Sequence, residues 1–281
     1  MRRSQYRYGR SGNRRGGAMR LLPIVLFGLY LAYYYFSNQE EVSMTGRSQL
    51  IDISRDQEKA LGLQSYNQIL SQERVMQSGQ AVDLVREIGY RLAEVIDEDL
   101  DFEWEFNVIE SEQANAFALP GGKVAVYTGI LPVVKNIDGL SAVMGHEIAH
   151  AVARHGAERM AHQKLVQYGS MAAGMALGSM DIGTQRMVMG ALGMGAQYGV
   201  LLPFSRKHES EADYMGLVYL ARACFDPREA PEIWKRMGEH SKGASQPSEF
   251  MSTHPSHETR IRQLNEWMPE ALEIKEKYCG S

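Results

Sequence analysis

The motif at residues 146–150, HEIAH, constrains the folding of this chain more than any other feature. Apolar side chains recur around it at the spacing of one helical face, and they are Leu140, Val143, Met144, Ile148 and Val152. Residues four apart share a face of a helix, so both histidines can bind one metal ion with Glu147 beside it. A buried helix that carries two imidazoles and an acid is costly unless these groups have a partner. The sequence therefore predicts a buried helix that binds a metal ion.

Zinc is the predicted ion, one per chain, because it accepts neutral imidazole and carboxylate ligands without redox chemistry. The two histidines of the motif leave a catalytic zinc one protein ligand short. The missing carboxylate is expected in residues 204–213, FSRKHESEAD, which open another predicted helix. Glu209 and Asp213 share a face there, so one can reach the metal while the other accepts a hydrogen bond from a ligand histidine. Glu211 lies about 200° from Glu209 around the helix, so at most one of them faces the metal, and spacing leaves that choice open.

In these residues and their order the chain resembles peptidase family M48, and within it the Oma/BepA-like branch. HEIAH is followed by SRKHESEAD, whose E-x-x-x-D pattern falls on Glu209 and Asp213. Other matching stretches are residues 115–122, 202–206 and 253–256. The resemblance covers residues 55–268. It implies a zincin-like fold, polypeptide substrates, and His146, His150 and Glu209 as zinc ligands. One departure is Cys224, where glycine is usual, and it concerns a loop.

The chemistry that this resemblance implies is hydrolysis of peptide bonds. Zinc lowers the pKa of its bound water to about 7 and polarises the scissile carbonyl. Glu147 is expected to take the proton of that water and to deliver it later to the leaving amine. His254 is the candidate donor for the developing oxyanion, with Arg206 or a tyrosine as rivals. The alternative for His254 is a place on the zinc as a fourth, inhibiting ligand.

Two residues are expected to support the ligands without touching the metal, and they are Asp213 and Arg206. Asp213 would fix the tautomer of a ligand histidine by accepting its hydrogen bond. The remaining histidines are interpreted as surface or packing residues, and they are His155, His162, His208, His240 and His257.

A substrate-binding strand is expected at residues 124–127, at a sheet edge above the metal. An extended substrate could pair with it through main-chain hydrogen bonds, and Val124 and Val126 are the candidate contacts. Further candidate contacts are Asn115, Gly121 and Gly122. The alternative interpretations are a tight turn at the glycines and support of the loop backbone by the asparagine.

The order of predicted elements gives an α+β fold, mainly helical, with helices packed on one side of a small sheet. Predicted helices at 54–71 and 80–97 precede strands at 104–110, 116–119 and 123–127. Residues 165–202, rich in glycine and methionine, suggest either a second membrane span or a flexible helical hairpin packed on the catalytic helices. Asp181 and Arg186 interrupt the run, which favours the hairpin.

The N-terminal segment is predicted to be a single transmembrane helix. Residues 21–36, LLPIVLFGLYLAYYYF, carry no charge and end in tyrosines suited to the lipid–water boundary. Seven arginines precede them, and the positive-inside bias puts these in the cytoplasm. The predicted organisation is a basic head at 1–20, an anchor in the lipid bilayer at 21–37, a polar linker at 38–53 and the protease domain at 54–281.

The predicted location is the bacterial inner membrane, with the catalytic domain in the periplasm and the mitochondrial inner membrane as the alternative. A cleaved signal peptide is disfavoured because no small-x-small site follows the apolar run. A mitochondrial presequence is disfavoured because four glycines in the head weaken an amphipathic helix. Cys224 and Cys279 would face an oxidising compartment, so a disulfide between them is plausible.

Charge excludes nucleic acid as a partner. The first 39 residues carry a formal charge of +7, and because the whole chain carries −4, the other 242 residues carry −11. A body this acidic repels phosphate backbones. The leading hypothesis is a membrane-anchored zinc endopeptidase that acts on misfolded or envelope proteins. The second is a chaperone-like or binding module whose zinc site is mostly shut, although a pure binder has no need of Glu147. Oligomeric state is left open.

Overall fold

The computed structural model describes residues 16–96, 100–177, 181–196, 201–242, 249–254 and 258–280, with side chains omitted at 16–24, 176, 195–196, 202–204, 241–242 and 249. The helices are α1 (Gly16–Ser37), α2 (Arg55–Gln72), α3 (Gln80–Ala93), α4 (Leu131–Val134), α5 (Ile137–Val152), α6 (His155–Leu177), α7 (Ile182–Ala196), α8 (Leu202–Arg222), α9 (Glu229–Lys242), α10 (Glu249–Thr253) and α11 (Glu258–Cys279). The strands are β1 (Gln39–Glu41), β2 (Ser48–Leu50), β3 (Val75–Met76), β4 (Glu105–Ile109), β5 (Ala116–Leu119) and β6 (Lys123–Tyr127). The described chain is mainly helical with small sheets, which confirms the α+β class. The expected packing of helices on one side of the sheet is wrong, because Tyr66 of α2 packs on the face of β6 that carries Ala125, while Val124 and Val126 face the main core on the other side.

Side-chain caps set the starts of two helices that matter for the site. Ser54 accepts a hydrogen bond from the backbone N–H of Gln57 (3.2 Å), and the Gln57 side chain accepts one from the N–H of Ser54 (3.1 Å). This capping box starts α2 at the residue expected from the sequence. Asn136 caps α5 with a single hydrogen bond, since its Oδ1 accepts from the N–H of Gly139 (2.6 Å).

The larger sheet has the strand order β3-β4-β6-β5. β6 pairs in parallel with β4, where Val124 lies opposite Phe106, and antiparallel with β5, where Val124 lies opposite Ala118. β6 is therefore an inner strand. The prediction of a sheet edge at residues 124–127 is wrong, because the backbone groups of β6 are used on both sides. The edge strand beside β6 is β5, and it packs against α5, the helix that carries HEIAH.

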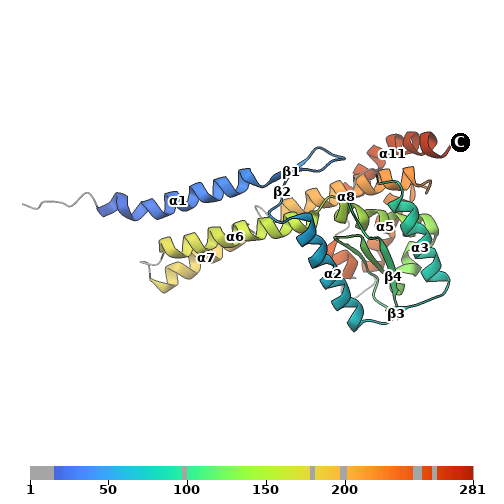
Figure 1. Ribbon diagram of the computed structural model, residues 1–281, viewed down its shortest axis with the longest axis horizontal. Helices are drawn as coiled ribbons and strands as arrows, with labels where there is room; N and C mark the ends of the chain where they lie inside the picture. Colours follow the sequence, from blue (N-terminus) through green and yellow to red (C-terminus); the bar gives the residue numbers. More distant parts are fainter. Residues whose placement is uncertain are drawn as a thin grey trace, which may run out of the picture.

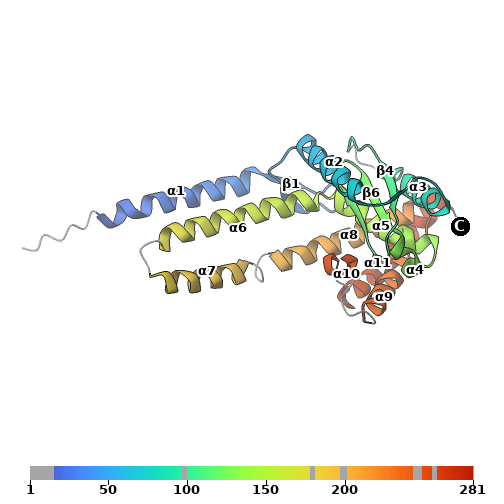
Figure 2. The same cartoon turned by 90° about the horizontal axis from the view of Figure 1, so that it is seen from below.

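Helices α5 and α8 approach closely because two glycines lie at their crossing (Figures 1 and 2). A Cβ atom added to Gly216 would lie 3.0 Å from the backbone nitrogen of His146, and one added to Gly145 would lie 2.7 Å from Leu220 Cδ1. Buried members of the predicted apolar stripe on α5 are Leu140, Val143, Met144, Ile148 and Val152. The core thus fixes HEIAH beside the acidic residues of α8.

Residues 38–53, predicted as a polar linker, instead form a hairpin that packs on the body of the protein. β1 and β2 pair antiparallel, and Leu50 is buried. Arg154, between α5 and α6, donates to Glu40 of β1 (2.5 Å) and to Glu58 of α2 (2.7 Å). The sequence did not indicate this hairpin for two reasons. Strands of three residues are too short to show an alternating pattern, and the ion pair that docks β1 joins residues 114 positions apart.

Helices α1, α6 and α7 extend together away from the body (Figures 1 and 2). The ring of Tyr34 packs edge-on against Tyr168 of α6, with 6.4 Å between centroids. The predicted hairpin is present as α6 and α7, although residues 178–180 and 197–200 lie outside the described part. The hairpin does not pack along the catalytic helices as expected, and Met175 is 71% exposed.

The predicted anchor at residues 21–37 falls within α1, whose side chains are described from residue 25 onward. Within the described part of the chain, none of the helices combines the length and the apolar character needed to cross a bilayer. Residues 1–15 of the predicted basic head, and His257, lie outside the described residues.

A disulfide joins Cys224, just after α8, to Cys279 at the end of α11, with 5.7 Å between the Cα atoms. The two helices also pack along each other, so the bond holds the C-terminal helix on the helix that carries Glu209. Cys224 has a φ of 64°, a left-handed conformation that favours glycine. The disulfide gives cysteine a role at this position, where the resemblance led us to expect glycine.

Candidate metal centre

Four side chains bring metal-binding atoms within 4.8 Å of one another, and they are His146 and His150 of α5, Glu209 of α8 and His254, which follows α10. His146 Nε2 lies 3.1 Å from His150 Nε2 and 3.4 Å from Glu209 Oε2. Nδ1 of His254 lies 3.0 Å from Glu209 Oε1 and 3.3 Å from His146 Nε2. The three ligands expected from the sequence thus lie together, and His254 completes the group.

This donor set fits zinc in both spacing and charge. A tetrahedral zinc with bonds of about 2.0–2.1 Å holds its ligand atoms about 3.3 Å apart, close to the separations found here. Burial holds the pKa of His150 well below its usual value, so this ring offers a neutral lone pair. Burial opposes the charge of Glu209, but the neighbouring His254 and His146 rings hold its pKa well below the usual value, so it is an anion. Neutral imidazole and carboxylate are the ligands that zinc prefers.

His146 shows that the cluster attracts positive charge. Burial disfavours a charged ring, yet the adjacent carboxylates of Asp213 and Glu209 raise its pKa to about 9. The carboxylates around His146 therefore favour a positive charge at this point of the donor group. A bound cation would supply this charge.

Glu209 and Glu211, which spacing could not separate, point to different places. Glu209 faces the imidazoles, while Glu211 Oε2 lies 2.9 Å from Nε2 of His155 and accepts from Arg47 Nε at 2.7 Å. Both carboxylates are buried. The arrangement agrees with Glu209 as the ligand that the family resemblance implies, and it gives Glu211 a separate set of partners.

Glu147 lies next to the ligands and is buried. Its Oε1 is 3.5 Å from Nε2 of His254. Burial raises the pKa of the Glu147 carboxyl, although the nearby His254 and His146 rings act in the opposite direction. A carboxylate whose proton affinity is raised by burial is suited to accept a proton from water and to return it.

A buried arginine that was not among the candidates from the sequence supports the ligands. Arg260 of α11 donates two hydrogen bonds to Asp213, both 2.7 Å, and its Nη1 lies 2.9 Å from Glu209 Oε2. Asp213 Oδ1 lies 3.1 Å from Nδ1 of His146, as expected for a group that orients a ligand. The guanidinium of Arg260 also packs over the ring of Trp234, 3.7 Å from its centroid.

Arg206, the residue expected in this supporting position, is exposed and forms no ion pair among the described residues. It lies about one helical turn before Glu209 on α8. A sequence signal for Arg260 did exist, because it shares a helical face with the buried residues Leu264 and Ala271. A charge at a core-facing position of a helix requires a buried partner.

A second buried polar network begins at the other ring nitrogen of His150. Nδ1 of His150 lies 2.8 Å from Nδ1 of His155, and His155 stacks on His208 with 4.0 Å between centroids. Burial lowers the pKa of His155 to about 4, so its ring is neutral. His208 Nε2 lies 2.8 Å from Glu158 Oε2. His155 and His208 are thus parts of a polar network, not simple packing residues, whereas His240 is exposed as expected.

The residues expected to contact substrate instead lie in the sheet and in the segments next to its strands. Val124 and Val126 are fully buried. Gly121 and Gly122 have φ values of 87° and 82°, which supports the turn interpretation. Asn115 Oδ1 accepts from the N–H of the next residue at 3.0 Å, so this side chain holds the local backbone. The register of β5 turns the backbone groups of Ala116 and Ala118 away from β6, and these are the groups at the sheet edge.

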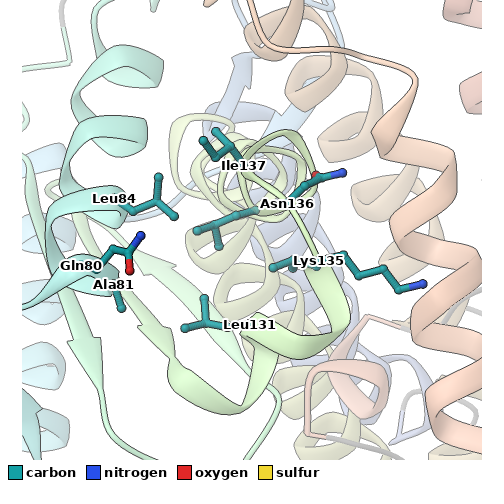
Figure 3. A pocket seen from close by; sticks show the side chains of 9 residues that line it. Gln80, Ala81, Leu84, Leu131, Lys135, Asn136 and Ile137 are labelled. Atoms are coloured by element: carbon teal, nitrogen blue, oxygen red, sulfur yellow. The ribbon is translucent and has the colours of Figure 1, made fainter.

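A pocket of about 330 Å³ opens at the start of α5 (Figure 3). Side chains from three helices line it, including Leu84 of α3, Leu131 of α4 and Ile137 of α5. Ile137 precedes His146 by nine residues, about 13 Å along a helix. The pocket is therefore separate from the metal donors and contributes none of them.

Comparison with known proteins gives concordant matches. The sequence profile of Peptidase family M48 matches residues 81–268. The mitochondrial metalloendopeptidase OMA1 of Schizosaccharomyces pombe is 39% identical over 251 residues, which cover 88% of this chain and 72% of the relative. The mitochondrial metalloendopeptidase OMA1 of Homo sapiens is 33% identical over 269 residues, 91% of this chain and 51% of the relative. The beta-barrel assembly-enhancing protease of Yersinia pestis is 28% identical over 221 residues, 77% of this chain and 45% of the relative. These matches confirm the resemblance drawn from the motifs.

Proposed function

Because the chain belongs to peptidase family M48 and is a metalloendopeptidase, we propose that it uses one zinc ion to hydrolyse peptide bonds of misfolded or envelope proteins in protein quality control. The observation that carries this proposal is the cluster of His146, His150 and Glu209 with the buried acid Glu147 beside it. These three residues would hold the zinc. When bound, zinc supplies an acidic water and a Lewis acid for the carbonyl.

The protein's own groups have distinct roles in the proposed reaction. Glu147 accepts a proton from the attacking water and delivers it to the leaving amine, the work for which its burial suits it. Asp213 holds the ring of His146 through Nδ1, which leaves Nε2 free for the metal. Arg260 neutralises Asp213 and Glu209 and keeps both carboxylates in place.

The edge strand β5 supports a preference for extended polypeptide. The outward-facing backbone groups of Ala118 and the carbonyl of Ala116 can pair with a substrate strand. Main-chain pairing gives affinity without a strict sequence preference, which suits a protease of unfolded chains. This role replaces the one first expected for Val124 and Val126.

The proposal also includes attachment to a membrane through residues 21–37 and the identity of that membrane. The arginine-rich head and the uncharged stretch that follows support a single anchor. We keep the bacterial inner membrane, with the domain in the periplasm, and the mitochondrial inner membrane as alternatives. The OMA1 proteins of Schizosaccharomyces pombe and Homo sapiens both carry the word mitochondrial in their names, which supports the second.

Metal removal tests the enzyme directly. The purified full chain is expected to cleave casein, and treatment with 1,10-phenanthroline should reduce cleavage to background because the water loses its activator. One equivalent of zinc per chain should restore the rate, whereas magnesium should not, since its ligands are oxygens. Release of fluorescent casein fragments measures the rate. Cleavage by metal-free protein at the original rate would contradict the proposal.

The second candidate, a mostly latent zinc site, is favoured by one observation, the place of His254 Nδ1 among the metal donors. A fourth ligand there would occupy the position that water needs. We therefore expect His254→Ala to raise the casein rate about tenfold, the factor that corresponds to release of a contact worth about 1.4 kcal/mol.

The exposed His240→Ala variant serves as the control for loss of a histidine, and zinc content should equal one in both proteins. If His254 instead stabilises the oxyanion, the rate falls by about 10²–10³-fold. That fall would remove the latent-site candidate.

A further inference from the structure

We propose that Arg47 is a positioning residue of the metal centre, which acts through Glu211 and His155 on the zinc ligand His150. The inference rests on the proposed zinc centre and adds to it a residue that lies about 90 positions before the start of α5. Arg47 lies in the hairpin between β1 and β2, in the segment predicted to be a linker.

A continuous series of contacts leads from Arg47 to the metal donors. Arg47 Nε donates to Glu211 Oε2 at 2.7 Å. The same carboxylate oxygen lies 2.9 Å from Nε2 of His155, and Nδ1 of His155 lies 2.8 Å from Nδ1 of His150. The other ring nitrogen of His150, Nε2, is the atom that faces the donor group. No step in the series is longer than a hydrogen bond.

With neutral rings, and a metal ion on Nε2 of His150, the protons along the series have one consistent placement. Glu211 accepts only, so His155 carries its proton on Nε2 and has a lone pair on Nδ1. His150 must then carry its proton on Nδ1 to donate to that lone pair. This leaves the lone pair of His150 on Nε2, where a metal ion needs it. The series therefore fixes both the tautomer and the orientation of the ligand.

Arg47 is needed because two buried carboxylates lie side by side at the outer end of the series. Its Nη1 and Nη2 atoms donate to the two oxygens of Glu158 at 2.9 and 2.7 Å, while its Nε binds Glu211. The side chains of Glu158 and Glu211 are 2% and 5% exposed. Without the guanidinium they repel each other, and Glu211 turns away from His155. Thr45 and His208 donate to the same carboxylates but cannot replace the positive charge.

The hairpin holds Arg47 in a defined position. The N–H of Val42 donates to the carbonyl of Arg47 (2.9 Å), and the N–H of Gly46 donates back to the carbonyl of Val42 (2.8 Å). Val42 is buried in the main core. Arg47 is therefore presented by an ordered turn, which a positioning residue requires.

The test compares zinc affinity across a double-mutant cycle in the full chain. Arg47→Met and His155→Phe are each expected to raise the zinc dissociation constant about 10–100-fold, measured by competition with a chromophoric chelator. Because both act through the same contact on His150, the double variant should lose no more than the larger single loss. The visible absorption of the cobalt-substituted protein should change in the same way in all three variants.

Glu40→Gln is the matched control, because it weakens the docking of the same hairpin through Arg154 without touching the series. It should lower thermal stability while zinc affinity and the cobalt spectrum stay unchanged. Additive losses in the double variant, or unchanged affinity in Arg47→Met, would overturn the inference. If Arg47→Met does not fold, Arg47→Lys and His155→Phe carry the same comparison.

The proposed function can be separated from this inference. An unsubstituted chain that binds zinc and cleaves casein, with Arg47→Met binding zinc equally well, overturns the inference alone. An unsubstituted chain that binds no zinc overturns both.

Discussion

Replacing Glu147 with glutamine is expected to lower kcat for casein cleavage by about 10²–10⁴-fold while the protein keeps its zinc. Glutamine has nearly the same shape but cannot accept and return a proton, so the attacking water loses its base. Glu147 is not among the four residues of the donor group, so metal binding should survive. Steady-state cleavage rates together with zinc content per chain measure the two parts of this expectation.

Glu87→Gln, an exposed acid on α3, is the matched control and should leave kcat unchanged. A Glu147→Gln protein that retains zinc and cleaves at the original rate would show that the base lies elsewhere. A variant that loses both zinc and activity would instead assign a structural role to Glu147.

Replacing Arg260 with methionine is expected to lower the free energy of unfolding by about 3–5 kcal/mol. Methionine fills similar space but leaves Asp213 and Glu209 buried without their cation. It also removes the contact with the Trp234 ring. Urea unfolding followed by circular dichroism, with chelator present, measures the effect without a contribution from bound metal.

Arg262→Met provides the control on the same helix, because Arg262 is exposed and pairs with Glu266, one helical turn away, at 3.6 Å. Exposed pairs contribute about 0–1 kcal/mol, so this variant should unfold almost as the original chain does. If Arg260→Met were destabilised no more than Arg262→Met, the buried ion pairs would not support the site as described.

The sequence predicted the helices of the site because their signals are local. HEIAH lies on an apolar stripe of period 3.6, and Ser54 starts α2 with its own cap, so neither requires knowledge of distant residues. The choice between Glu209 and Glu211 needed the family pattern. Helical spacing gives the angle between two side chains on one helix, but not which of them faces a second helix.

The failed expectations concern contacts between distant residues. An apolar run such as that of β6 identifies a buried strand but not its neighbours, so residues 124–127 were assigned to an edge that β5 occupies. The choice of Arg206 as the arginine that supports the ligands failed for the same reason, because Arg260 takes this place through a contact between distant residues. Arg206 stands in a charged run close to Glu209 in sequence, whereas Arg260 reaches the same carboxylate from 51 residues away, through the packing of α11 on α8.

The docked hairpin decides what happens when the chain is cut near its N-terminus. A break between Gln39 and α2 would separate β1 from the body, and with it the pairing that holds β2 and Leu50 in the core. Cleavage of the chain between Gln39 and α2 would therefore inactivate the protease. Cleavage before Gln39 would release an intact protease domain from its proposed anchor. The boundary of the working enzyme thus lies upstream of the region that looks like a disposable spacer.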